Sequence, residues 1–326
     1  MTITEIARMA EVSVSAVSRY MNNGYVSEEK AERIREVIRK TGYRPSKQAQ
    51  SMRTGRSKVI GVILPRLSSE SIARVADGIS EVLAEEGYQM LLASTENDPK
   101  KEIEYLRLLD KNPVDGILFS ATIFDKEHRE ALNHLHVPIV IIGQKFENFP
   151  CVYHDDYGAE YAMMEQLLKS GRKRIGYLCV NQKDEAAGRQ RTKAYCDALK
   201  AYGHPLRREL VEETGFSVDS GYEAMKRLAD RAPELDAVCC ATDSLAVGAM
   251  MYLKEAGRQI PKEIAVTGVG HNRMSNVVTP KLTTAHLHYR TSGGEAARIL
   301  VESIEKKDSI SRQLMLGYDV ILSESI

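Results

Sequence analysis

The chain has 326 residues, of which 43% are hydrophobic, so we expect two or three folded units with sizeable cores. Its formal net charge is zero, but residues 1–60 carry 12 Lys and Arg against 6 Asp and Glu, a net of +6, which leaves 33 against 39, a net of −6, for the remainder. A basic amino-terminal module on an acidic body suits a polyanionic partner, although an ordinary solvated surface would look similar. No apolar stretch approaches the roughly 20 residues that a membrane span requires.

The first residues lack the basic and apolar segments of a secretory signal, and the five cysteines are odd in number without a CxxC spacing. We therefore expect a cytoplasmic protein with reduced thiols, no metal site and no cofactor.

Three short helical patterns fill residues 2–42. Two short helices separated by a tight turn, with a third that completes a small core, are typical of a helix-turn-helix unit. The predicted helices begin at a cap on Thr2 or Thr4, at Ser13 and at Ser27, and the third ends at Gly42.

The second helix of such a unit lies in the major groove of DNA, so its outward side chains should face base edges. Val17 should instead point into the core. The side chains expected to face DNA are Val14, Ser15, Ala16, Ser18 and Arg19. Arg19 could bind guanine or a phosphate, and the sequence leaves both open, as it does the alternative that Arg19 is an ordinary surface residue.

Residues 2–7 (TITEIA) and 12–22 (VSVSAVSRYMN) resemble the opening of the lactose-repressor (LacI/GalR) family, T-I-x-D-V-A … V-S-x-x-T-V-S-R-x-L-N. Glu5 stands where Asp is usual, and Ala16 replaces a Thr whose hydroxyl commonly touches the DNA backbone. The resemblance implies a sequence-specific DNA-binding transcriptional repressor that acts on operator DNA. It implies DNA contacts by Thr2, Ser13, Val14, Ser15, Ala16, Ser18, Arg19, Asn22 and Tyr43.

The resemblance continues through residues 42–46 (GYRPS) and 49–55 (AQSMRTG). Here the family has a hinge helix that folds only on DNA, paired with its dimer mate in the minor groove. Ala49 and Met52 would then contact DNA, with Met52 at the position of the apolar wedge that unstacks and kinks a base step. Without the family, residues 46–57 look like a basic linker.

From Lys58 onward, apolar runs of strand length alternate with amphipathic helices. Runs that are apolar on both faces predict parallel sheets in a doubly wound α/β fold. The predicted strands are 59–64, 90–93, 116–119, 139–142, 174–179, 237–241, 264–268 and 318–322, and the helices are 71–86, 99–111, 126–135, 158–170, 188–202, 219–231 and 244–256.

Two such sets resemble the two-lobed, periplasmic-binding-protein-like body of the same family, whose ligand lies in the interlobe cleft, where strands end. The implied organisation is a headpiece (1–45), a hinge (46–57) and an effector-binding and dimerisation domain (58–326). The N-lobe would comprise about 58–156 and 286–315, and the C-lobe about 157–285 and 316–326. The family's effector contacts fall on Ser120, Arg191, Phe216, Thr242, Asp243 and Tyr289; Arg191 could instead be a surface arginine and Phe216 a core residue.

The family usually has G-[YF]-D-D where this chain has residues 268–272, GVGHN. Gly270 removes a carboxylate, whereas His271 and Asn272 can donate hydrogen bonds. The resemblance implies a repressor of a carbohydrate-utilisation operon whose effector is a sugar or a sugar phosphate. With Arg191 and Arg189 nearby, the exchange at 268–272 suits an anionic effector such as a sugar phosphate. Together with residues 151–156 (CVYHDD), it resembles the sucrose- and trehalose-operon repressors of the family.

No heptad segment follows residues 318–322, so we expect a homodimer without a tetramerising tail. An enzyme is not predicted, because the glycines at 268 and 270 make an incomplete GxGxxG and no Walker A or nucleophile–base spacing occurs. A transport protein would need an export signal and would lack residues 1–55. The remaining alternative is a global carbon-catabolite regulator of the same family with a phosphoprotein corepressor.

Overall fold

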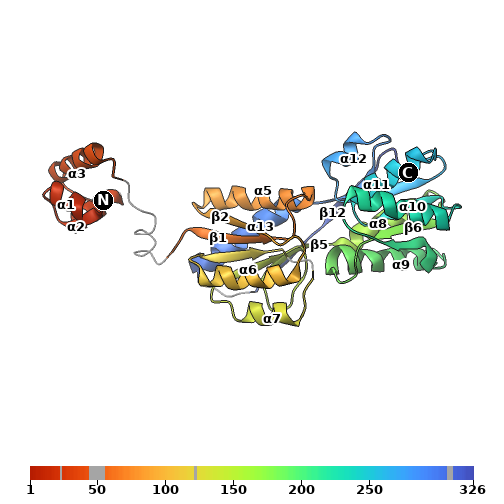
Figure 1. The fold of residues 1–326 in the computed structure, drawn as a ribbon, viewed down its shortest axis with the longest axis horizontal. Helices are drawn as coiled ribbons and strands as arrows, with labels where there is room; N and C mark the ends of the chain where they lie inside the picture. Colours follow the sequence, from red (N-terminus) through yellow and green to blue (C-terminus); the bar gives the residue numbers. More distant parts are fainter. Residues whose placement is uncertain (23, 44–55, 121–122, 307–310) are drawn as a thin grey trace. The chain divides into compact units, whose positions relative to one another are not determined.

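The computed structural model describes residues 1–22, 24–43, 56–120, 123–306 and 311–326. Two compact units are present, Met1–Lys58 and Val59–Ile326 (Figure 1). The predicted hinge contacts Ala49 and Met52 lie outside the described residues. No helix in the described ranges is long and apolar enough to cross a membrane.

The first unit contains three helices, α1 (Ile3–Met9), α2 (Val14–Met21) and α3 (Glu28–Thr41). Thr2 caps α1 in a capping box: its hydroxyl accepts from the Glu5 backbone N–H, and its own N–H donates to the Glu5 carboxylate at 2.7 Å. Glu5, a departure from the family pattern, therefore has a local role. Gly42 ends α3 at a φ of 64°, a left-handed conformation that favours glycine.

The headpiece core brings one face of each helix together. Its buried members are Ile6, Ala7, Ala10, Val17 and Ile34. The predicted inward orientation of Val17 is confirmed, since its side chain is fully buried.

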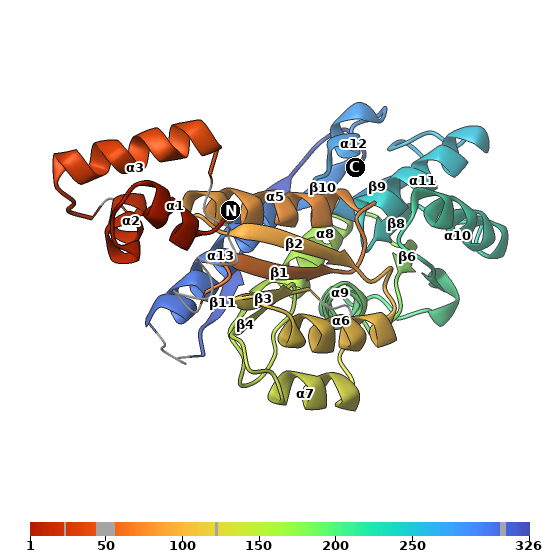
Figure 2. The ribbon, with the colours of Figure 1, turned by 60° about the vertical axis from the view of Figure 1, so that its left-hand side comes forward.

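The first sheet of the second unit has the order β11-β5-β4-β3-β1-β2, and all of its recorded strand pairs are parallel. Two helices pack on each face of it (Figures 1 and 2), and this layer forms the N-lobe. The strands are β1 (Val59–Leu64), β2 (Gln89–Ser94), β3 (Gly116–Phe119), β4 (Ile139–Ile142), β5 (Cys151–His154) and β11 (Gln313–Leu316); α5 (Glu70–Glu85) and α13 (Tyr289–Lys306) cover one face, and α6 (Pro99–Lys111) and α7 (Lys126–Asn133) the other.

The second sheet forms the C-lobe, with the order β12-β10-β9-β8-β6-β7 and an antiparallel β10–β12 pair at one edge. Alternate residues of β8 join two different cores, which explains why its sequence is apolar throughout. The strands are β6 (Ile175–Cys179), β7 (Val211–Glu213), β8 (Ala237–Cys240), β9 (Ala265–Val269), β10 (Thr283–Leu287) and β12 (Tyr318–Ile321); the helices are α8 (Asp156–Lys169), a π-helical turn (Glu185–Gln190), α9 (Arg191–Ala201), a 3-10 turn (Arg208–Leu210), α10 (Val218–Arg231), α11 (Asp243–Glu255) and α12 (Arg273–Val277).

The chain passes between the two sheets three times in the described ranges: from β5 to α8, from β10 to α13, and from β11 to β12. Each lobe is therefore built from segments that are distant in sequence. The pattern analysis did not predict β5, β7, β10, β11, α12 or α13.

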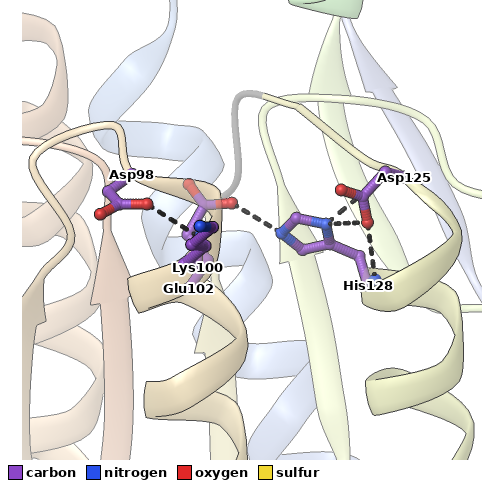
Figure 3. Close-up of polar contacts among 5 residues, drawn as sticks. All are labelled: Asp98, Lys100, Glu102, Asp125 and His128. Carbon is purple, nitrogen blue, oxygen red and sulfur yellow. Dashed lines mark hydrogen bonds and ion pairs between the residues drawn. The ribbon is translucent and has the colours of Figure 1, made fainter.

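A buried polar network joins α6 to α7 in the N-lobe (Figure 3). His128 Nε2 lies 3.0 Å from a Glu102 carboxylate oxygen, and both side chains are fully buried. His128 Nδ1 lies 2.8 Å from Asp125, whose carboxylate also caps the first turn of α7. Burial disfavours the imidazolium, but the hydrogen bonds to Glu102 and Asp125 outweigh it and raise the pKa of His128 above its usual value.

We expect His128→Leu to lower the free energy of unfolding by about 3–5 kcal/mol, because it deprives the buried Glu102 of its imidazole partner. A raised pKa in the folded state means that the stabilisation is full below the unfolded pKa and is lost as pH rises through the folded pKa. Urea unfolding measures this at pH 6 and pH 9. The difference in the free energy of unfolding between wild type and variant should be smaller at pH 9 than at pH 6.

His136→Leu is the matched control, because His136 pairs with Asp110 at 2.9 Å while its side chain is 86% exposed. It should change the free energy of unfolding by less than about 1 kcal/mol. Equal losses in the two variants would contradict the importance of the buried network.

Candidate functional site

The exposed face of α2 is the candidate DNA-binding surface. Val14 is 43% exposed, and Ser15 and Arg19 are also exposed. The Arg19 Nε–H donates to the Ser15 carbonyl at 3.4 Å, a local contact that lays the arginine along the helix. Asn22 donates to the Ser18 carbonyl, so its side chain closes the carboxyl end of α2.

Ala16 is a correction to the sequence analysis. Its side chain is only 4% exposed, whereas the analysis placed it among the side chains that face DNA. Positions 16 and 20 lie one helical turn apart, and Tyr20 packs against the headpiece core together with Met21. The buried face of α2 is therefore wider than the single inward residue Val17.

Ser13, Thr2 and Tyr43, which the resemblance places at the DNA, also make contacts within the headpiece. The Ser13 hydroxyl accepts from the Ala16 backbone N–H at 3.2 Å and lies 2.9 Å from the Ser15 hydroxyl. Thr2 is engaged in the capping box of α1. Tyr43 is half-buried and packs against the headpiece core.

We predict that Ser13→Ala destabilises α2 by about 0.5–2 kcal/mol, because the Ala16 amide loses its cap. Ser27→Ala is the control, since Ser27 occupies the cap position of α3 without a side-chain hydrogen bond. Hydrogen exchange of the headpiece amides in the full chain measures the stability of α2 and α3 in both variants. Similar protection in the two variants would argue against the capping role of Ser13.

A cleft of about 660 Å³ lies where strands of both sheets end. Its N-lobe residues follow β1, β3, β4 and β5 or lie at the start of α13, and its C-lobe residues come from the segments after β6, β7, β8 and β9. Such a cavity is of the size that small-molecule sites have. Six of the predicted residues line it: Ser120, Arg191, Phe216, Thr242, Asp243 and Tyr289.

His271 does not line the cleft, contrary to the sequence prediction. Its Nδ1 lies 3.0 Å from His286 Nδ1, and its Nε2 lies 3.2 Å from the Asn276 amide nitrogen. Left-handed backbone at Gly270 (φ 138°) and His271 (φ 48°) turns the chain here. Asn272 reaches the cleft instead and caps α12 by accepting from the Ser275 N–H.

Arg191 is held by a buried ion pair. Its Nε–H and Nη2–H donate to one Asp156 oxygen at 2.9 and 2.6 Å, and Nη1 donates to the Ala241 carbonyl. Although burial opposes the charge, Asp156 raises the pKa of Arg191, so the guanidinium stays charged.

Arg189 is exposed, pairs with Glu185 at 3.2 Å and does not line the cleft. The anionic-effector prediction relied on both arginines. The charge of Arg191 is instead compensated by Asp156, and Arg189 is a surface residue outside the cleft.

Four carboxylates line the cleft: Glu70, Asp156, Asp184 and Asp243. Burial raises the pKa of Asp184 to about 6, against hydrogen bonds from the Ala187 and Gly188 amides. Burial likewise raises the pKa of Asp243 to about 6, against hydrogen bonds from Thr284 and the Asn272 amide. Both remain mainly ionised at neutral pH.

The sequence analysis missed Arg66, Glu70, His154 and Asp184 as cleft residues. A polar residue shortly after an apolar strand is the signal that could have identified Arg66. His154 is the last residue of β5, a strand that the sequence analysis did not predict, so the same signal is absent there. Asp184 lies in a longer segment ahead of the π-helical turn, for which spacing gives no signal.

Three contacts connect the lobes across the cleft. The Arg66 guanidinium carbon lies 4.0 Å from the centre of the Phe216 ring, a cation–π distance. Glu70 accepts from the Arg273 backbone N–H at 2.9 Å, and Arg74 donates to the His271 carbonyl at 3.1 Å. All three N-lobe residues lie in or just before α5.

Two family profiles match the chain. The profile of "Bacterial regulatory proteins, lacI family" matches residues 2–46, and that of "Periplasmic binding proteins and sugar binding domain of LacI family" matches residues 57–321. Among curated relatives, the sucrose operon repressor of Staphylococcus xylosus is 32% identical over 303 residues, which cover 93% of each chain.

Two solved structures resemble the fold over the whole chain. The complex of the transcriptional regulator CelR with cellobiose has a TM-score of 0.78 at 27% identity, covering 100% of each chain. The lac repressor dimer bound to operator and the anti-inducer ONPF has a TM-score of 0.90 at 19% identity, covering 100% of this chain and 98% of that one, which shows a shared fold.

Proposed function

The chain belongs to the LacI family of bacterial regulatory proteins, and we propose that it represses carbohydrate genes under the control of a neutral sugar bound in the interlobe cleft. It is a DNA-binding transcriptional regulator, not an enzyme. Its headpiece binds operator double-stranded DNA through the exposed face of α2, with Arg19, Val14 and Ser15 as the principal contacts. Its place of action is the bacterial cytoplasm, on the nucleoid.

The charge of the cleft is the observation that carries the choice of effector. The cleft is lined by two guanidinium groups, those of Arg66 and Arg191, and by four carboxylates, so the formal net charge of its lining is 2 − 4 = −2. One of the two cations is already paired with Asp156. A phosphate dianion would meet net repulsion here, whereas sugar hydroxyls can donate to carboxylates.

The remaining surface of the cleft suits a pyranose or furanose. Phe216 and Tyr289 supply aromatic faces for the C–H side of a sugar ring. Ser120 and Thr242 add hydroxyl groups, and Arg191 retains N–H groups beyond those that bind Asp156 and Ala241. We therefore retain these predicted contacts, together with Asp243, as effector-binding residues and remove His271 from the set.

We propose a homodimer, because a helix-turn-helix pair matches two operator half-sites. Apolar exposure supports a partner along the edge strand β2, where Leu91 is 48% exposed.

Arg19→Ala should abolish the preference for an operator over unrelated DNA, since each good base contact contributes about 1–3 kcal/mol. Operators are first selected from a random DNA pool with the wild-type protein. Fluorescence anisotropy then measures the affinity of each variant for a selected operator and for unrelated DNA. Arg35→Ala is the control, because Arg35 is paired with Glu32 and Glu28 on α3. An Arg19 variant with undiminished selectivity would show that α2 is not the reading helix.

Neutral sucrose or cellobiose should bind at least tenfold more tightly than its 6-phosphate, measured by calorimetry at pH 8, where Asp184 is ionised. Asp184→Asn should narrow that ratio several-fold by removing one repelling carboxylate. Glu185→Gln is the control, because Glu185 is the adjacent carboxylate and does not line the cleft.

Tighter binding of the phosphate would contradict the neutral effector and restore the anionic one. Operator affinity that responds to a phosphorylated carrier protein and to no sugar would favour the global regulator instead.

A further inference from the structure

His154 is the last residue of β5, at the crossover to the C-lobe, and it lines the cleft. Its side chain is buried, with an exposed fraction of only 6%. Its Nε2 atom has no hydrogen-bond partner. Among the cleft-lining side chains that the structure describes, His154 alone has a buried nitrogen or oxygen atom without a hydrogen-bond partner.

We propose that His154 is a specificity-determining residue that recognises one hydroxyl of the effector through Nε2. The inference rests on the proposed function, because it concerns the same cleft, and it adds a requirement: the sugar must present a free hydroxyl to this nitrogen.

The surroundings of His154 fix its ring in place. The ring meets Tyr289 edge to face, with 5.0 Å between the ring centres. Asp156 and Arg191, whose charges act on the imidazole, are already bonded to each other. The nitrogen is therefore held in one position before any ligand arrives, and no ionised neighbour binds it.

The imidazole is neutral at physiological pH. Burial lowers the pKa of His154, and the positive charge of Arg191 lowers it further, whereas Asp156 and a hydrogen bond to the His288 backbone act in the opposite direction. Because Nε2 has no partner, the bond to His288 is made by Nδ1, which therefore carries the proton of the neutral ring and leaves Nε2 as an acceptor. A sugar hydroxyl can donate to this nitrogen, whereas a fully ionised phosphate cannot.

A ligand-recognition role and a structural role predict opposite changes in stability. A buried polar atom without a partner destabilises the ligand-free protein, so an apolar replacement should stabilise it. A structural histidine would instead be needed for folding. Binding sites commonly carry such a local cost, which is recovered when the ligand arrives.

The test is thermal unfolding of the full chain, with and without sucrose, cellobiose and ribose as probes. His154→Phe should raise the Tm of the ligand-free protein by about 2–4 °C and weaken binding of the stabilising sugar at least tenfold. His154→Gln, which retains a polar group near the position of Nε2, should recover part of the binding.

Tyr177→Phe is the matched control. The Tyr177 hydroxyl is also buried without a partner, but it lies in the C-lobe core and does not line the cleft. Its removal should raise the Tm as well, yet leave sugar binding unchanged.

The result that would overturn the proposal is a His154→Phe protein with a lower ligand-free Tm, or with wild-type sugar affinity. A wild type that none of the sugars stabilises would count against the proposed effector class, and the ligand-free comparison would then decide for or against His154 by itself. Once a binding sugar is known, its deoxy analogues extend the test. The analogue that lacks the recognised hydroxyl should bind wild type and His154→Phe equally weakly.

Discussion

The ion pair between Arg191 and Asp156 connects the parts from which the cleft is made. Asp156 begins α8, directly after the chain leaves the N-lobe, and Arg191 begins α9 after the π-helical turn. Both side chains are 5% exposed, so each charge would be costly to bury without the other. The guanidinium also donates a hydrogen bond to the Ala241 carbonyl, directly after β8. One side chain thus joins the crossover, a strand end and a helix start.

This pair also determines which electrostatic field a ligand meets. A positive charge that is already compensated leaves the other carboxylates of the cleft dominant, and among them Asp184 and Asp243 are held by backbone amides. Such groups are oriented before binding and need little rearrangement to accept hydroxyl donors. The cleft is therefore preorganised for neutral polar groups, although two arginines line it.

Much of the fold could be predicted from the sequence because the strongest signals are local. Threonine and serine caps and long apolar runs gave the headpiece helices and most of the central strands. The missed strands β5, β7, β10 and β11 lack a continuous apolar run: β5 and β10 contain histidine or threonine, and β7 and β11 are partly exposed. Ala16 was misplaced because a small side chain gives no sign of which helix face it occupies.

The site was harder to predict than the fold, and for a physical reason. Residues that follow parallel strands converge on one edge, so positions such as Ser120 and Asp243 could be placed in the cleft. Their partners could not: Asp156 lies 35 residues before Arg191, and Thr284 lies 41 residues after Asp243. A motif shows which side chains reach a site, but the charge of that site depends on pairs formed by folding.

The three crossovers between the lobes also affect how the protein is made. β11 completes the N-lobe sheet beside β5, and β12 completes the C-lobe sheet beside β10. Neither sheet can therefore be complete until residues 313–321 have been synthesised. The headpiece depends on contacts within its own first residues and is synthesised first. At about 5–20 residues per second, the ribosome needs roughly 10–50 s to make the rest of the chain. During that interval a nascent chain contains a DNA-binding module whose ligand-sensing domain is incomplete.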